Sequence, residues 1–196
     1  MTETLTYSII GYIIGSIPFG YIYAKFFTGV DLREFGSHST GTTNVLRCGN
    51  KKLAAVTLVS DVLKGSLVTV ASLIFCDYKA AIFASFFCVI GHVYPVWLKF
   101  KGGKGAATTA GTFLVFSPVV ALVSAIIWGI TAKFSKISSL ASLIFCLSFT
   151  IITIFRFCVG DADLYLLVYS CLILFFLLFS HRNNINRLIH KEENTF

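Results

Sequence analysis

Charged residues are scarce in this chain. Only 13% of its 196 residues are Asp, Glu, Lys or Arg, whereas 56% are hydrophobic. A soluble domain of this length needs a polar exterior, and this composition does not supply one. The net charge of +7 does not indicate a nucleic-acid partner, because the cations lie between apolar runs rather than along one basic stripe. The sequence therefore predicts a single transmembrane domain over residues 1–196.

Several signatures of chemistry are also missing. The six cysteines form no Cys-x-x-Cys pair and show no metal-ligand spacing, so we expect buried free thiols and no metal site. The chain has no Gly-x-Ser-x-Gly nucleophile motif and no Asp-Gly pair of the CDP-alcohol phosphotransferase kind. No His is followed five positions later by Asp, which is the common acyltransferase dyad. No cation precedes the first apolar run, so we expect a retained span rather than a cleaved signal peptide.

Long apolar runs are the main feature that is present. Runs of spanning length lie near residues 5–27, 53–75, 80–98, 137–155 and 162–180. One further run, 106–132, is long for a single helix and is divided by Ser117-Pro118. These runs predict an all-α bundle that crosses the membrane several times.

Charge decides whether the divided run crosses once or turns back at Pro118. Lys and Arg cluster at 25–52, 99–104, 133–136 and 182–191, whereas acidic residues mark Glu3, Asp77, Asp161 and Asp163. The positive-inside rule places the basic clusters in the cytoplasm, which requires a turn at Pro118. We therefore predict seven transmembrane helices, with the N-terminus outside and the C-terminus inside. The fourth and fifth, of about 12 and 15 residues, are short and separated near Pro118; six spans is the alternative.

The first basic segment contains a loop of small and hydroxyl residues, Gly36-Ser-His-Ser-Thr-Gly-Thr-Thr-Asn-Val-Leu-Arg47. Such residues let backbone N–H groups approach an anion closely, and Arg47 can add a charge-assisted fork. This composition predicts either an anion site or a solvated turn.

The second loop, Phe100-Lys-Gly-Gly-Lys-Gly105, packs two lysines among three glycines directly before an expected helix from Ala106. Exposed amides and a helix N-terminus beside Lys101 and Lys104 favour a phosphate site. Gly105 stands where a Walker A loop requires Ser or Thr, so nucleotide hydrolysis is not indicated. The competing interpretation is a pair of juxtamembrane lysines that touch anionic lipid.

Three ionisable residues fall inside apolar runs. Asp61 and Lys64 share one helix face at i, i+3, and ionisable groups at such depth are usually functional. At about 1.5 Å per residue, His92 lies at a similar depth to Asp61. The alternative is that Asp61 and Lys64 pair only to fix helix packing and that His92 is a packing residue.

The tail that follows the last span, Ser180-His-Arg-Asn-Asn-Ile-Asn-Arg-Leu188, is polar from its start. Its arginines suffice for a positive-inside stop signal. The additional His181 and Asn184 suit hydrogen bonding to a polar ligand.

Together these motifs resemble the bacterial acyl-phosphate-dependent glycerol-3-phosphate acyltransferase family, and the resemblance covers almost the whole chain in order. The matching residues are Gly15-Ser-Ile-Pro-Phe-Gly20, Gly36-Ser37 with Gly41 and Thr43-Asn-Val-Leu-Arg47, Asp61-Val-Leu-Lys-Gly65, Gly91-His-Val-Tyr-Pro95, Phe100-Lys-Gly-Gly-Lys-Gly105, and His181-Arg with Asn184-Ile and Arg187-Leu188. Family members usually read Gly-Ser-Gly-Asn in the first loop, whereas this chain has His38 and Ser39 at the last two positions. Thr42 replaces the usual Ala, and Lys191 the glycine expected late in the tail.

The resemblance implies transfer of a fatty acyl group from acyl phosphate to the 1-hydroxyl of glycerol 3-phosphate. The product would be lysophosphatidic acid, in the phospholipid synthesis of the bacterial cytoplasmic membrane. It implies no cofactor; the expected partners are the two substrates and membrane lipids. Because acyl phosphate already has a good leaving group, we expect direct attack by the hydroxyl, with positioning and charge neutralisation supplying most of the rate. The donor phosphate would accept the proton, with His181 as the runner-up base.

Roles follow for individual residues. We expect Lys104, His181 and Asn184 to be catalytic, the last two by orienting glycerol phosphate. Asp61, Lys64, His92 and Arg182 would support the site from beneath. The phosphate-binding set is Ser37, Thr43, Asn44, Arg47, Lys101, Gly102, Gly103 and Lys104.

A small transporter for a phosphorylated solute is the rival class, since the break at Pro118 fits the discontinuous helices of transporters. Against it, the polar residues gather toward one membrane face. A structural scaffold would not explain Asp61, Lys64 or the double-glycine loop.

Overall fold

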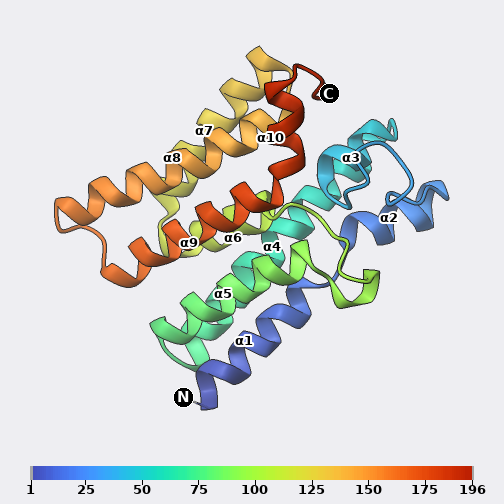
Figure 1. Cartoon of the computed structure of the whole chain (residues 1–196). Helices are drawn as coiled ribbons and strands as arrows, with labels where there is room; N and C mark the ends of the chain where they lie inside the picture. The colour runs from blue at the N-terminus through green and yellow to red at the C-terminus, as the bar shows by residue number, and fades with distance from the viewer. Residues whose placement is uncertain (1, 196) are drawn as a thin grey trace. The chain divides into compact units, whose positions relative to one another are not determined.

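The computed structural model describes residues 2–195. In this part of the chain the regular secondary structure consists of α-helices and one short 3-10 helix (Figure 1). Contacts divide it into two compact units, Met1–Thr112 and Phe113–Phe196. The expected all-α membrane bundle is confirmed, because five helical segments are long and apolar enough to cross a bilayer. A sixth joins them if the pair bent by 63° near the C-terminus is one span.

The first unit begins with a helix pair that occupies the first apolar run. The helices are α1 (Thr2–Gly15) and α2 (Phe19–Thr28). Pro18 divides them because it has no N–H to donate within a helix. The span expected over 5–27 is present as one candidate span, Thr2–Thr28, and the structure adds the break at Pro18 inside it.

The rest of the first unit surrounds two long helices. They are α4 (Lys51–Phe75) and α5 (Tyr78–Val93), and α3 (Thr42–Arg47) and the short 3-10 turn η1 (Val96–Leu98) lie in the flanking segments. Side chains cap both long helices, since Asn50 Oδ1 accepts from Leu53 N at 2.9 Å and Asp77 Oδ1 accepts from Ala80 N at 2.6 Å. Each cap satisfies a backbone donor that has no partner inside the helix.

Glycines set how closely the helices of the first unit approach. A Cβ added to Gly15 would lie 2.1 Å from the Cys88 carbonyl oxygen, so α1 and α5 pack backbone against backbone. The next helix, α6 (Ala106–Phe116), meets α4 in the same way, because a Cβ at Gly111 would lie 2.0 Å from the Val62 carbonyl oxygen. Ser66 Oγ also donates to the Gly111 carbonyl at 2.8 Å. In lipid the hydrophobic effect does not drive helices together, so close van der Waals packing at small residues stabilises such crossings instead.

The second unit is built from α7 (Pro118–Ser135), α8 (Ser138–Cys158), α9 (Leu164–Ser180) and α10 (Arg182–Ile189). The expected break at Ser117-Pro118 is confirmed, since α6 ends at Phe116 and Pro118 begins α7. The expectation that both flanking helices are short holds for α6, with 11 residues, but not for α7. That helix continues past Lys133 to 18 residues, which is long enough to cross.

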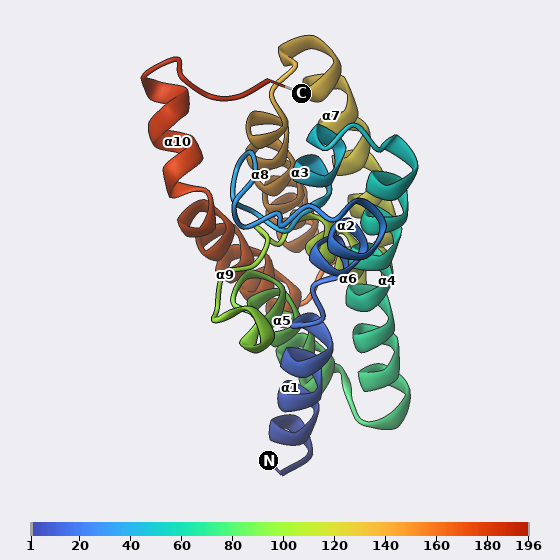
Figure 2. The same ribbon diagram turned by 90° about the vertical axis from the view of Figure 1, so that its right-hand side faces the viewer.

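Each unit has two chemically different ends. In the first, Cys76 Sγ lies 3.7 Å from Glu3 Oε2, so the acidic N-terminus and the α4–α5 turn share one end, far from α3 at the other (Figure 2). In the second, Arg156 at the end of α8 donates to Ser117 Oγ and, at 3.0 Å, to the Asp161 carbonyl. Within each unit, the acidic residues marked by the charge pattern lie at one end, and the membrane side that this end faces stays a prediction.

All six cysteines are free thiols, as expected. Only two are buried, Cys88 and Cys146, and Cys158 is exposed, so burial was overestimated.

Candidate active site

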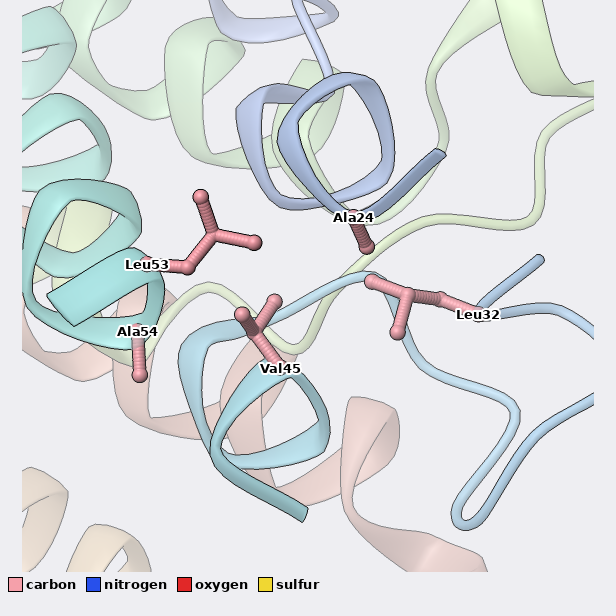
Figure 3. Packing of buried hydrophobic residues seen from close by; sticks show 5 residues of the cluster. All are labelled: Ala24, Leu32, Val45, Leu53 and Ala54. Carbon is pink, nitrogen blue, oxygen red and sulfur yellow. The ribbon is translucent and has the colours of Figure 1, made fainter. Parts of the chain in front are cut away.

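A small apolar cluster anchors the first loop (Figure 3). Ala24 of α2, Leu32 of the loop, Val45 of α3, and Leu53 and Ala54 of α4 are all buried in it. The cluster ties the loop to three helices. Packing in this apolar cluster therefore helps to fix the backbone conformation of an otherwise polar loop.

Asn44 is the polar centre of this loop. Its side chain is buried, its Oδ1 accepts from Ser37 N at 3.1 Å, and its Nδ2 lies within 3.1 Å of the carbonyl oxygens of Leu32, Phe35 and Ser39. The loop backbone thus occupies both ends of the amide. Through these bonds the Asn44 side chain holds the shape of the loop, and its expected phosphate role stays a prediction.

Two positions of the loop have left-handed backbone. Gly36 has φ of 57°, and a Cβ there would lie 2.3 Å from Asn44 Oδ1 and 3.7 Å from Arg47 Cδ, so only glycine fits. His38 has φ of 56° at the position where the resemblance leads us to expect glycine. Its Nδ1 donates to the Arg33 carbonyl at 2.8 Å, and this bond shows how a histidine is held in a strained conformation.

The turn that leads into the loop is braced by an ion pair. Arg33 donates to Asp31 through Nη2 at 2.7 Å and through Nε at 3.0 Å, and it lies over the Tyr21 ring. The hydrogen bond from the Arg33 side chain lowers the pKa of Asp31 to about 2. The sequence analysis did not single out this pair.

The glycine loop is fastened to the end of α5. Gly103 N donates to the His92 carbonyl at 3.0 Å and Gly102 N to the Val93 carbonyl at 3.1 Å. Thr40 N donates to the Gly102 carbonyl at 3.3 Å, so the two motif loops meet through their backbones. Gly105 has φ of 94°, after which α6 begins at Ala106. Lys101 is exposed and Lys104 half-buried beside this helix start.

The three ionisable residues of the apolar runs form one buried group. Lys64 Nζ lies 2.8 Å from Asp61 Oδ1, and His92 Nδ1 lies 3.4 Å from the same oxygen. The expected i, i+3 pairing and the matched depth of His92 are therefore both confirmed. All three side chains are buried. Removing either charge of the Asp61–Lys64 pair would therefore leave the other charge buried without a counter-ion, which is strongly destabilising.

In the second unit, the start of the polar tail holds two of the expected residues. His181 is buried, and its Nδ1 donates to the Leu177 carbonyl at 2.8 Å. A carbonyl can only accept, so in the neutral ring the lone pair is on Nε2, the nitrogen a base would use. Arg182 instead is exposed and lies over the Phe179 ring, 4.4 Å from its centre.

Asn184 has an anionic partner that the sequence analysis missed. Glu193 Oε1 accepts from Asn184 Nδ2 at 2.6 Å and from Ser139 Oγ at 2.9 Å, and Glu193 Oε2 accepts from Arg187 Nε at 2.7 Å. Burial raises the pKa of Glu193, but the three hydrogen bonds outweigh it and the pKa lies below its usual value. The tail is thereby tied to the start of α8, so Lys136 and the tail lie at the same end of this unit.

The structure therefore brings the expected residues together in two groups. In the first unit, Ser37, Asn44 and Arg47 border one loop, which meets Gly102, and His92 connects Gly103 to Asp61. In the second, His181 and Asn184 lie one turn apart. No group of three or more His, Cys, Asp or Glu residues that could hold a metal ion occurs in residues 2–195.

Comparison with known proteins gives a consistent result. The family model described as "Glycerol-3-phosphate acyltransferase" matches residues 5–191. A glycerol-3-phosphate acyltransferase of Agrobacterium fabrum is 42% identical over 182 residues, covering 93% of this chain and 86% of its own. A glycerol-3-phosphate acyltransferase of Brucella suis is 44% identical over 187 residues, which cover 94% of this chain and 89% of the Brucella protein.

Two crystal structures of PlsY (YgiH), an integral membrane glycerol 3-phosphate acyltransferase, share the fold. The glycerol 3-phosphate form has a TM-score of 0.89 at 36% identity, and the lysophosphatidic acid form a TM-score of 0.86 at 35% identity. Each comparison covers 98% of this chain and 95% of the other.

Proposed function

This chain belongs to the integral membrane glycerol-3-phosphate acyltransferase family and makes lysophosphatidic acid, and we propose that its acyl donor is acyl phosphate and its acceptor the 1-hydroxyl of glycerol 3-phosphate. The observation that carries this proposal is the junction of the two motif loops. Thr40 N and the Gly102 carbonyl join a hydroxyl-rich loop to a glycine loop that carries Lys101 and Lys104. Two loops built for anions suit two substrates that both carry phosphate.

The reaction needs little covalent chemistry from the protein. The hydroxyl oxygen attacks the acyl carbon, the bond from that carbon to the phosphate oxygen breaks, and inorganic phosphate leaves. The hydroxyl proton passes to the donor phosphate, with His181 Nε2 as the runner-up acceptor. What the protein must do is hold two anions together against their repulsion.

Each group has a role in this scheme. Lys104 neutralises charge on the leaving phosphate of the acyl donor, and His181 and Asn184 orient the glycerol phosphate. Asn44 shapes the first loop, and Arg182 steadies the tail by stacking on Phe179. The remaining phosphate-binding residues are Ser37, Thr43, Asn44, Arg47, Lys101, Gly102 and Gly103.

The topology we propose has seven spans in the bacterial cytoplasmic membrane. The short helix α6 supplies the seventh crossing, since it packs closely on α4 through Gly65 and Gly111 and so needs less lipid contact. The N-terminus lies outside, and the motif loops and the tail lie in the cytoplasm, where charge favours them. Residues 1–196 then form one catalytic domain.

A donor assay tests the proposed function. Purified protein in detergent receives glycerol 3-phosphate with either acyl phosphate or acyl-CoA, and released phosphate and lysophosphatidic acid are measured together. We expect equal amounts of both products with acyl phosphate, without added metal, and almost no product with acyl-CoA. A thioester donor generally needs a base dyad, and no His-x4-Asp pair exists here. Comparable turnover with acyl-CoA overturns the proposed donor.

A further inference from the structure

A closed circuit of contacts runs beneath the two motif loops. Its first part is the buried group in which the ammonium of Lys64 and the ring of His92 share Asp61 Oδ1. The exposed fractions of these residues are 3%, 7% and 2% in that order. Placing three ionisable groups so deep in an apolar protein is expensive, and a packing role alone does not need them.

Lys64 connects this group to the break between α1 and α2. Its Nζ donates to the Ile17 carbonyl at 3.1 Å and lies 5.7 Å from the centre of the Phe19 ring. Ile17 and Phe19 flank Pro18, so the ammonium holds both sides of the break. It thereby fixes where α2 starts.

The start of α2 in turn supports the first loop. A Cβ at Gly20 would lie 2.1 Å from the Thr40 carbonyl oxygen, so α2 and the loop touch with no side chain between them. Thr40 N then donates to the Gly102 carbonyl. Any shift of α2 is therefore passed to both motif loops.

His92 closes the circuit from the other side. A Cβ at Gly103 would lie 2.0 Å from His92 Nε2, so the ring packs directly against the backbone of the glycine loop. The opposite ring nitrogen, Nδ1, faces Asp61. One ring thus transmits the position of the buried ion pair to the backbone next to Lys104.

We propose that Asp61, Lys64 and His92 are positioning residues that set the spacing between the two motif loops, and so the spacing at which the two phosphate-bearing substrates are held. In this role none of the three would touch substrate. The inference rests on the proposed phosphate role of the loops. It adds that the ion pair, through the α1–α2 break on one side and His92 on the other, determines substrate affinity rather than the chemical step.

Paired variants test this idea. Asp61→Asn leaves the Lys64 ammonium without its counter-ion, whereas Asp61→Asn with Lys64→Gln removes both charges and keeps the side-chain sizes. We expect the single variant to raise the KM for both substrates by about ten- to a hundredfold, the double variant to raise it less, and kcat to change little in either.

His92→Asn separates the two contacts of the ring. It keeps a donor toward Asp61 but removes the atoms behind Gly103, so KM should rise while the pH profile of kcat keeps its shape. A changed pH profile, with kcat nearly abolished, would make His92 a catalytic residue and overturn the proposal.

The matched control uses the same two helices. Thr69 of α4 and Ser85 of α5 share a buried hydrogen bond of 2.7 Å that lies outside the circuit. Thr69→Val with Ser85→Ala should leave KM unchanged even if the melting temperature falls. If the Asp61 and His92 variants also change only the melting temperature, their role is structural and the proposal fails.

Binding of glycerol 3-phosphate, measured by calorimetry without any donor, keeps this test separate from the proposed reaction. If wild type binds glycerol 3-phosphate but does not use acyl phosphate, the donor proposal fails while the positioning proposal is still tested by affinity. Unchanged affinity in the Asp61 and His92 variants then refutes the positioning proposal alone.

Discussion

The contact between Gly103 and His92 makes Gly103→Ala a sensitive probe of the glycine loop. The new methyl group would lie 2.0 Å from Nε2, and ordinary contact begins near 3.4 Å. The ring cannot retreat easily, because it is buried and its Nδ1 faces Asp61. The loop must therefore move by more than an ångström and take the neighbouring Lys104 with it.

The size of the effect follows from overpacking. Inserting a methyl group into a closely packed site costs about 1–3 kcal/mol, which corresponds to roughly five- to a hundredfold in affinity. We expect a KM for the phosphate-bearing substrates that is about five- to a hundredfold higher, with a smaller change in kcat, in steady-state assays on purified protein.

Gly129→Ala is the control for that substitution. Gly129 lies within α7, and a Cβ there has nothing within 4 Å, so alanine should leave KM unchanged and stabilise the helix by about 0.5–1 kcal/mol. The reasoning is refuted if Gly103→Ala matches wild type in both KM and melting temperature.

Three further predictions concern the charged residues and the topology. Lys104→Ala should lower activity by about ten- to a hundredfold, since a charge-assisted hydrogen bond to phosphate contributes about 1.5–3 kcal/mol. The control Lys136→Ala should change activity little. Equal losses of activity in the two variants would contradict a phosphate role for the loop. Glu193→Gln should lower the melting temperature at neutral pH and weaken Asn184-dependent activity. Because the folded pKa of Glu193 is lowered, its stabilisation is present above the unfolded pKa and is lost as pH falls through the folded one, so melting curves of wild type and variant should converge on acidification. Ser135→Cys, in a background without native cysteines, should react with an impermeant thiol reagent only after the cells are opened; labelling from outside would rule out the turn at Pro118.

The two proline breaks show where local reasoning succeeds. The break at Pro118 was predictable because the run 106–132 is too long for one helix and the flanking charges require a turn. The break at Pro18 was missed, since the run 5–27 has an ordinary spanning length and a tilted helix can tolerate proline. What makes this break stable is Lys64, which donates to the Ile17 carbonyl from 47 positions further along the chain.

Asn44 and Glu193 show what local reasoning does not supply. Asn44 is predicted to bind phosphate because it lies in a loop rich in anion-binding residue types, and the structure adds that its amide bonds four loop backbone groups. Glu193 was not singled out from the sequence, yet it accepts hydrogen bonds from Asn184, Arg187 and Ser139. The partners of a polar side chain depend on how the chain folds back, which composition does not encode.

The sequence by itself determined the membrane class and the helical content, and it predicts the orientation of the basic and acidic ends and a phosphate role for the motif loops. Each of these follows from transfer free energies that act residue by residue: apolar runs enter lipid, cations stay on one side, and glycines beside lysines expose amides to anions. Only the tertiary structure decided that one oxygen of Asp61 contacts both Lys64 and His92, and that the His92 ring packs against Gly103. Those contacts depend on distances of a few ångströms between helices, which backbone packing at Gly15, Gly20 and Gly111 sets and a linear pattern does not contain.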